Sequence, residues 1–134
     1  MQPAVACLTN AEEPNGVTRI NRIFHGILHK AQQGDWRGCM LCSAAAGPAA
    51  YDRDIAAEVH RLIEQMRAGF AVALAASPRH ANLTPVARQD LSALLMTHYT
   101  GLRILTRARA PLAELGAGVR ALDSILGVRN CDGL

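Results

Sequence analysis

Apolar residues recur at spacings of three and four along most of the chain, and no segment alternates apolar and polar residues with a period of two. Spacings of three and four gather side chains on one face of an α-helix, whereas a half-buried strand needs the period of two. Aromatic residues make up only 4% of the chain, which favours closely packed helices over a β-sandwich or barrel. The pattern predicts an all-α fold, in a single domain over residues 1–134.

Turn residues divide the chain into five predicted helices. Residues 1–16 are typical of the end of a helix followed by a loop, because Pro14, Asn15 and Gly16 together break a helix. We expect the helices over residues 17–32, 36–46, 52–76, 85–108 and 111–127. Asp35 is the expected N-cap of the second helix, and Thr84 followed by Pro85 is the expected start of the fourth.

Charge and composition exclude several classes of function. The net charge of +3 is too small to indicate nucleic-acid binding by this chain alone. The longest uncharged stretch, residues 38–51, is too short to span a bilayer, and the first residues do not resemble a signal peptide. We therefore expect a soluble cytoplasmic protein with reduced thiols. Because the chain has no phosphate-binding loop and no nucleophile beside a base, we expect neither an enzyme nor a cofactor.

The last two predicted helices have more apolar surface than one core needs. The fourth helix has a core face containing Leu91, Leu95 and Leu102, and a second face of Leu and small residues. The fifth helix has a heptad seam of Leu and Val. The seam is open to two interpretations, a core within the chain or a dimeric four-helix bundle. On the second interpretation the dimer interface contains Leu94, Thr97, His98, Gly101, Ile104, Leu105, Leu115, Val119, Leu122 and Leu126.

Three stretches together resemble the C-terminal regulatory domain of the tetracycline-repressor (TetR) family of bacterial regulators. They are GDWRGCMLCSAAAG at residues 34–47, the long amphipathic helix from Tyr51 to Ser77, and residues 91–126, with GLRILTR at Gly101–Arg107. The resemblance covers about residues 17–128. It implies a five-helix domain that binds a small apolar effector and forms a homodimer through its last two helices.

The chain departs from the family at its start. The family's DNA-binding helix-turn-helix needs three further helices, one of them basic, and residues 1–16 match at most the end of the helix that links the two domains. We therefore expect this chain alone not to bind an operator. The alternative to effector sensing is a helical homodimer, or a heterodimer partner of a longer relative, without a small-molecule ligand.

The resemblance implies a ligand pocket between the first, third and fourth predicted helices. Met and aromatic side chains form adaptable apolar walls. The candidates to line the pocket are Phe24, Trp36, Met66, Phe70, Met96 and Tyr99. The same residues also fit an ordinary core, because side chains at helical spacing usually pack against one another.

Cys39 and Cys42 form a Cys-x-x-Cys motif with more than one interpretation. A structural zinc site needs four ligands, and the other cysteines, Cys7 and Cys131, are single residues near the termini. A thioredoxin-like motif needs a neighbouring strand. Two interpretations remain, buried packing of two small side chains and a thiol sensor.

The remaining polar candidates have simple interpretations. His25 and His29 have the i, i+4 spacing of a metal pair but lack a third ligand, so we expect no metal site and a solvated or capping role. His98 is expected to be a hydrogen-bonded interface histidine. Arg103, Arg107 and Arg109 gather where they favour the negative end of a helix dipole, and an anion-binding role is the alternative.

Overall fold

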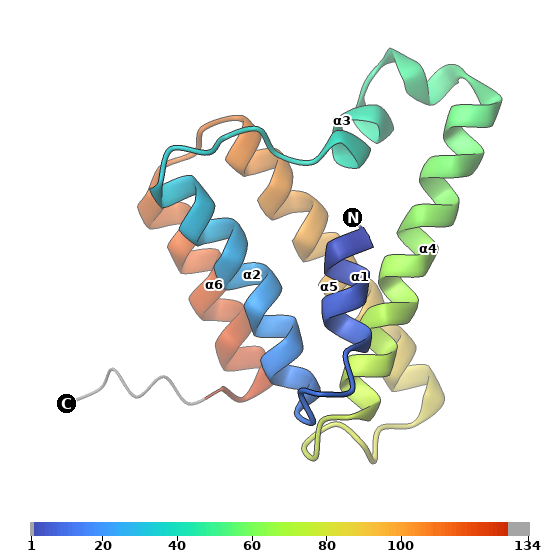
Figure 1. Cartoon of the computed structure of the whole chain (residues 1–134), viewed down its shortest axis with the longest axis vertical. Coiled ribbons are helices and arrows are strands. Elements are labelled where there is room, and N and C mark those ends of the chain that lie inside the picture. Colours follow the sequence, from blue (N-terminus) through green and yellow to red (C-terminus); the bar gives the residue numbers. More distant parts are fainter. Residues whose placement is uncertain (1, 129–134) are drawn as a thin grey trace.

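The computed structural model describes residues 2–128. The heptad seam of the fifth predicted helix lies within this range, and Cys131 lies outside it. These residues form six α-helices and one short 3-10 helix, with no strand (Figure 1). None of the described helices combines the length and the apolar content that crossing a membrane requires. The elements are α1 (Gln2–Thr9), α2 (Gly16–Gln32), α3 (Met40–Ala46), η1 (Pro48–Tyr51), α4 (Arg53–Ala75), α5 (Pro85–Arg107) and α6 (Leu112–Leu126).

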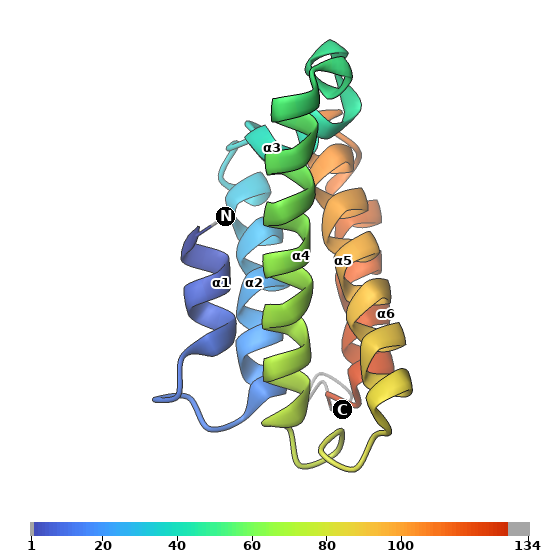
Figure 2. The same cartoon turned by 90° about the vertical axis from the view of Figure 1, so that its right-hand side faces the viewer.

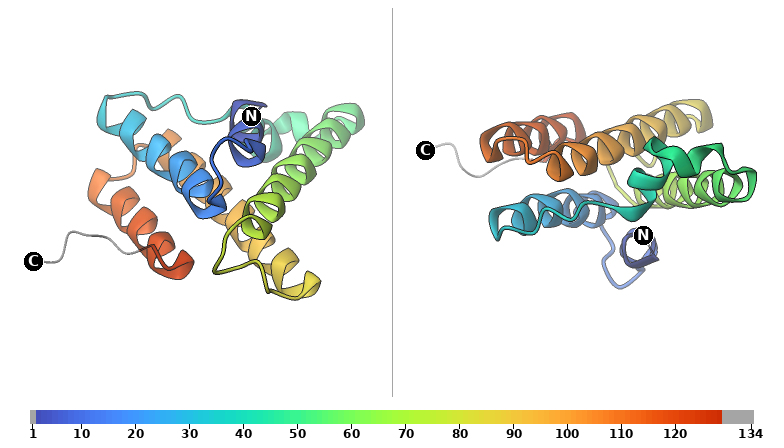
Figure 3. Two further views of the ribbon diagram at one scale, coloured as in Figure 1. Left: turned by 60° about the horizontal axis from the view of Figure 1, so that its bottom comes forward. Right: turned by 90° about the horizontal axis from the view of Figure 1, so that it is seen from above.

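The helices stack in two layers. Seen end-on, α5 and α6 form one layer, α2 and α4 form the other, and α1 lies on the far side of the second layer (Figure 3). Helix α6 packs against α2 and α5, and α4 packs along α5. Helices α4 and α5 lie next to each other in Figure 2, but Figure 1 shows that they meet near the loop that joins them and diverge towards α3. The predicted all-α fold is confirmed for the described residues.

Helix starts follow local capping chemistry in most cases. The Asn15 side chain accepts a hydrogen bond from the Val17 N–H at the start of α2, and Asp52 accepts two at the start of α4. The Thr84 hydroxyl accepts from the Ala87 N–H, with Pro85 in the first turn of α5. These bonds satisfy backbone donors that a helix leaves free at its first turn. The predicted start of α5 is therefore confirmed.

The prediction for the second helix was wrong at its start. Asp35 does not cap it; the Asp35 carboxylate accepts from the Arg37 backbone and guanidinium, and α3 begins only at Met40. Gly38 has a φ of +72°, a left-handed conformation that a continuous helix cannot include. An added Cβ on Gly38 would also come within 3.0 Å of the Arg107 Cβ. The chain therefore crosses α5 in an extended segment before α3 forms.

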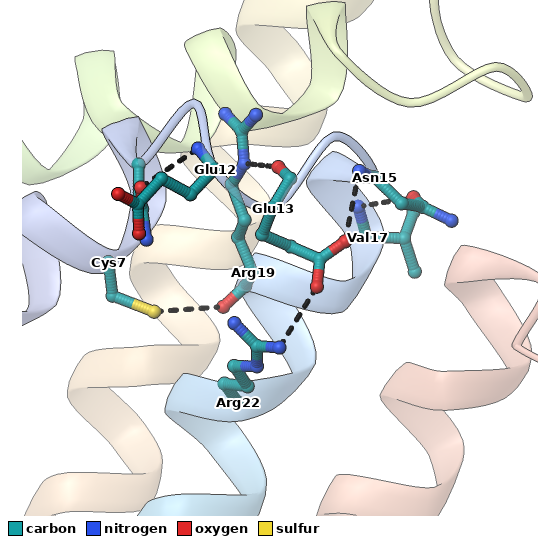
Figure 4. Close-up of polar contacts among 8 residues, drawn as sticks. Cys7, Glu12, Glu13, Asn15, Val17, Arg19 and Arg22 are labelled. Carbon is teal, nitrogen blue, oxygen red and sulfur yellow. Dashed lines mark hydrogen bonds and ion pairs between the residues drawn. The ribbon is translucent and has the colours of Figure 1, made fainter.

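Helix α1 is held to α2 by a buried arginine. Arg19 donates from Nε to the Glu13 carbonyl at 2.6 Å (Figure 4), and from Nη1 to the Leu8 carbonyl at 3.2 Å. The thiol of Cys7 donates to the Arg19 carbonyl. The guanidinium therefore satisfies carbonyl groups at the end of α1 and in the loop after it. This contact joins residues 2–13 firmly to the second layer.

His80 makes the fold sensitive to acid. The side chain is buried in the loop between α4 and α5, with Nδ1 2.9 Å from the Ser77 hydroxyl. Burial lowers the pKa of His80 below its usual 6.5, and the charge of Arg79 lowers it further. The folded chain thus binds this proton less tightly than the unfolded chain does. The contribution of His80 to the free energy of unfolding is therefore complete above pH 6.5 and is lost as the pH drops towards the folded pKa.

We expect His80→Gln to flatten the pH dependence of unfolding between pH 7 and pH 5. The measurement is the free energy of unfolding by urea at several pH values for both proteins. The difference between the two curves isolates His80 from the other titrating groups. Parallel curves would show that burial does not perturb His80.

Candidate ligand-binding site

Arg103 of α5 lies at the centre of the hollows in the structure. It lines four of them, with volumes of about 510, 550, 380 and 330 Å³. The other walls come from α1, α2, α3, α4 and the segment around Gly38. Cavities that bind small molecules usually measure about 300–1,000 Å³. The candidate site is therefore the space around this one guanidinium.

The Arg103 guanidinium is held in place but keeps free donors. Its Nη2 donates to the Gly38 carbonyl at 2.9 Å, and its carbon lies 5.9 Å from the centre of the Tyr99 ring. Its Nε is buried and makes no hydrogen bond within residues 2–128. Burial raises the pKa of Tyr99 to about 12, so this phenol stays protonated. Arginine carries five N–H donors, so Arg103 can still bind an acceptor.

The largest of these four hollows lies between α3 and α4 and has a mainly apolar wall. Leu41 and Ala44 come from α3, and Ile55, Val59 and Leu62 come from α4. Asp54 and Glu58, in the first two turns of α4, also line it. The side chain of Arg103 closes it towards α5. This hollow can take an apolar body, with positive charge on one wall and negative charge on another.

Most of the residues predicted to line a pocket are in the core instead. Phe24, Met66 and Phe70 are fully buried and Met96 nearly so, and none of them lines the hollows described above. The Phe24 ring stacks on Phe70 at 6.0 Å and meets the Tyr99 ring edge-on at 6.4 Å. Trp36 is half-buried against the same core. Of the six, Tyr99 lines a hollow, with α1 and α2.

Cys39 and Cys42 are buried beside Arg103. They are 7% and 4% exposed, and both line the hollow that Arg103 and Arg107 border. A hydrogen bond from Cys42 lowers the pKa of Cys39 to about 4, helped by backbone N–H groups of α3 and opposed by burial. The same hydrogen bond and burial raise the pKa of Cys42. The pair is thus poorly accessible, but one of the two thiols favours the thiolate.

The predicted interface residues fall into two groups. Leu115, Val119, Leu122 and Leu126 are each 1–2% exposed and belong to the core of the chain. Of the two interpretations of the heptad seam, the structure favours the core within the chain, because the seam of α6 packs inward against α2 and α5. On α5, Leu94, Ile104 and Leu105 are 40–48% exposed. Thr97 is exposed and Gly101 half-buried, with open space where its side chain would be.

Helices α5 and α6 carry more than half of the large apolar side chains that residues 2–128 expose. Residues 2–128 expose ten large apolar side chains, and six belong to these two helices. The six are Val86, Leu94, Ile104, Leu105, Leu112 and Ile125. Ala113, Ala117 and Ala121 of α6 are also exposed. We call these nine residues, together with Thr97 and Gly101, the outer face.

The histidine predictions have mixed outcomes. The His25 Nε2 is hydrogen-bonded to the carboxylate of the buried Asp123 of α6, with a separation of 2.9 Å, so His25 neither caps a helix nor is merely solvated. His29 is exposed. His98 lies between the Phe24 ring, 5.4 Å away, and Gly118 of α6. Its Nε2 is buried without a hydrogen bond in the described chain.

The role of Arg103 was not predictable from its position in the sequence. The residue is one of three arginines near the end of α5, and helical spacing alone does not distinguish them. Arg107 donates to the Arg37 carbonyl, and Arg109 is exposed with a φ of +56°. Only Arg103 combines a buried Nε with four hollows. No protein-family model matches this sequence, and no match was found among curated proteins or solved structures.

Proposed function

We propose that this chain is the effector-sensing and dimerisation domain of a TetR-like transcriptional regulator of the cytoplasm. One observation carries the proposal: α5 borders both the hollows and the outer face. Tyr99, Arg103 and Arg107 line hollows, whereas Leu94, Ile104 and Leu105 lie on the outer face. A ligand that shifts α5 would therefore also change the surface through which two copies associate.

The outer face supports a homodimer. Contiguous exposed apolar surface on a soluble chain usually marks an interaction site, and a stable dimer buries about 800 Å² on each partner. A two-fold axis that brings α5 and α6 of two copies together would combine them into a four-helix bundle. Gly101 would let the partner helix approach closely, because its own surroundings are open.

The route from effector to output would run through α1. Arg19 joins α1 and the following loop to α2, and α1 also packs on α4, with Leu8 against Gly69. In a relative whose first helix continues into a DNA-binding head, movement of α2 relative to α4 would move that head. An effector drives such a change only if it binds the two arrangements with different affinity. No catalytic step is part of the proposal.

We expect small apolar molecules to raise the melting temperature of the dimer. A ligand at one hundred times its Kd stabilises the folded state by about 2.7 kcal/mol. The measurement is a thermal shift screen, with the oligomeric state read by light scattering on the same samples. A dimer that no ligand stabilises would favour the alternative, a homodimer or heterodimer partner without an effector. A monomer would contradict the dimerisation half of the proposal.

A thiol sensor is the second candidate, favoured by the lowered pKa of Cys39. We expect alkylation of Cys39 by iodoacetamide, followed by mass spectrometry, to proceed at the same rate from pH 6 to pH 9, because a thiolate is the reactive form. Cys39→Ser gives the background from the other thiols. A rate that rises about ten-fold per pH unit would show an ordinary thiol. Alkylation only on unfolding would support the buried-packing interpretation.

A further inference from the structure

The surroundings of Arg103 carry more free positive charge than negative charge. Lys30 and Arg107 line the same hollow as Arg103, and none of the three forms an ion pair within residues 2–128. Asp35 also lines that hollow, but two hydrogen bonds join its carboxylate to the Arg37 side chain. That pair is close to neutral overall. The hollow of about 510 Å³ therefore has three unpaired cations.

The Arg103 guanidinium is held in one place on the wall of this hollow. The bond from Nη2 to the Gly38 carbonyl and the Tyr99 ring hold the guanidinium, and its Nη1 makes no hydrogen bond within residues 2–128. Hydrogen bonds from a guanidinium to an anionic acceptor are charge-assisted and about twice as strong as those between neutral groups. Carboxylates match the planar fork of arginine in geometry as well as charge. The favoured partner is thus a carboxylate.

An apolar wall begins directly beside this charged centre. The hollow of about 510 Å³ and the hollow of about 550 Å³ share Gly38, Met40 and Arg103. The second hollow continues along Leu41, Ile55, Val59 and Leu62. Asp54 and Glu58 also line this second hollow and would repel a second anionic group there. The site therefore suits one negative charge at Arg103 and an uncharged remainder.

We propose that the effector is an amphipathic monocarboxylate, whose carboxylate binds Arg103 and whose apolar body lies in the hollow between α3 and α4. This inference rests on the proposed function and narrows the effector from any small apolar molecule to an apolar acid. Lys30 and Arg107 add attraction without fixing the geometry, because Lys30 is exposed and Arg107 is bonded to the Arg37 carbonyl. The charge of the ligand therefore decides its affinity as much as its apolar surface does.

The test compares decanoate with decanol, which has the same chain length and no charge. Isothermal titration calorimetry at pH 7.5, below micelle-forming concentrations, gives both dissociation constants. We expect the wild-type chain to bind decanoate at least ten-fold more tightly than decanol. Arg103→Gln should weaken decanoate about ten-fold and leave decanol unchanged. Arg53→Gln is the matched control, because Arg53 is an exposed α4 residue and lines none of these hollows.

Each result has a definite meaning. Equal binding of decanoate and decanol by the wild-type chain would overturn the inference but leave the proposed function standing. Binding of neither molecule would count against both. If Arg103→Gln does not fold, Arg103→Lys replaces it: this variant keeps the charge without the fork, so it should lose part of the preference for decanoate. A full preference for decanoate in a folded Arg103 variant would show that the carboxylate lies elsewhere.

Discussion

Gly101→Glu is expected to give a folded monomer, whereas Val119→Asp is expected to abolish folding. Val119 is 1% exposed in the core, and an unpaired carboxylate there would cost about 4 kcal/mol, a large part of the stability of a small domain. Gly101 has no atom within 4 Å of the place its Cβ would take. Glutamate fits there, and replacing a glycine within a helix stabilises it by roughly 0.5–1 kcal/mol.

The two variants together separate the interface from the core. Light scattering measures the oligomeric state, and circular dichroism with urea unfolding measures the fold. Gln65→Glu is the control for added charge, since Gln65 is exposed on α4 and therefore lies outside the outer face of α5 and α6. We expect this variant to remain a dimer. A dimeric Gly101→Glu would show that the outer face is not the interface, and a well-folded Val119→Asp would contradict the assignment of Val119 to the core.

The sequence pattern predicts the helices well because each depends on local information. Apolar spacing, Asn15, Thr84 and the turn residues all act within a few positions of one another, and α2, α4, α5 and α6 lie within two residues of the expected ranges. The start of α3 depends instead on a distant contact. The chain at Gly38 crosses α5 beside Arg107, and the Gly38 carbonyl oxygen accepts a hydrogen bond from Arg103. The sequence of residues 34–47 alone therefore cannot predict where α3 begins.

The pattern does not distinguish which helix covers an apolar stripe. Leu115, Val119, Leu122 and Leu126 form a heptad seam whether the partner is α2 of the same chain or a helix of another copy. The structure favours packing against α2 of the same chain, since all four side chains of the seam are buried within one chain. The outer face on α5 was identified in part, at Leu94, Ile104 and Leu105, because that helix has more apolar surface than its own core uses.

The candidate ligand site was missed for a related reason. Large apolar residues such as Phe24, Met66 and Phe70 mark the interior, but an interior filled by its own side chains leaves no room for a ligand. Hollows form where packing is incomplete, here around a long charged side chain and beside the short helix α3. Which of Arg103, Arg107 and Arg109 occupies that place depends on the crossing of four helices.

Gly16→Ala is expected to destabilise the chain by about 3 kcal/mol, as overpacking of a tight contact does. Gly16 begins α2, and an added Cβ would overlap the carbonyl group of Ala73 near the end of α4. The Gly16 N–H also donates to the Ala76 carbonyl, so the backbones of α2 and α4 meet directly. A methyl group would separate the helices at the end that joins the loop after α1.

Gly26→Ala is the matched control in the same helix, and it is expected to have the opposite sign. Nothing lies within 4 Å of the place its Cβ would take, so the variant gains only helix propensity, about 1 kcal/mol. Urea unfolding of both variants and the parent chain measures the two effects. Two substitutions of equal chemistry that shift stability in opposite directions would establish the backbone contact between Gly16 and Ala73. Two stabilising changes would show that α2 and α4 do not approach so closely.

If the contact between Gly16 and Ala73 exists, α2 cannot slide along α4 at this end. An effector bound near Arg103 could then move these two helices only by pivoting them about Gly16.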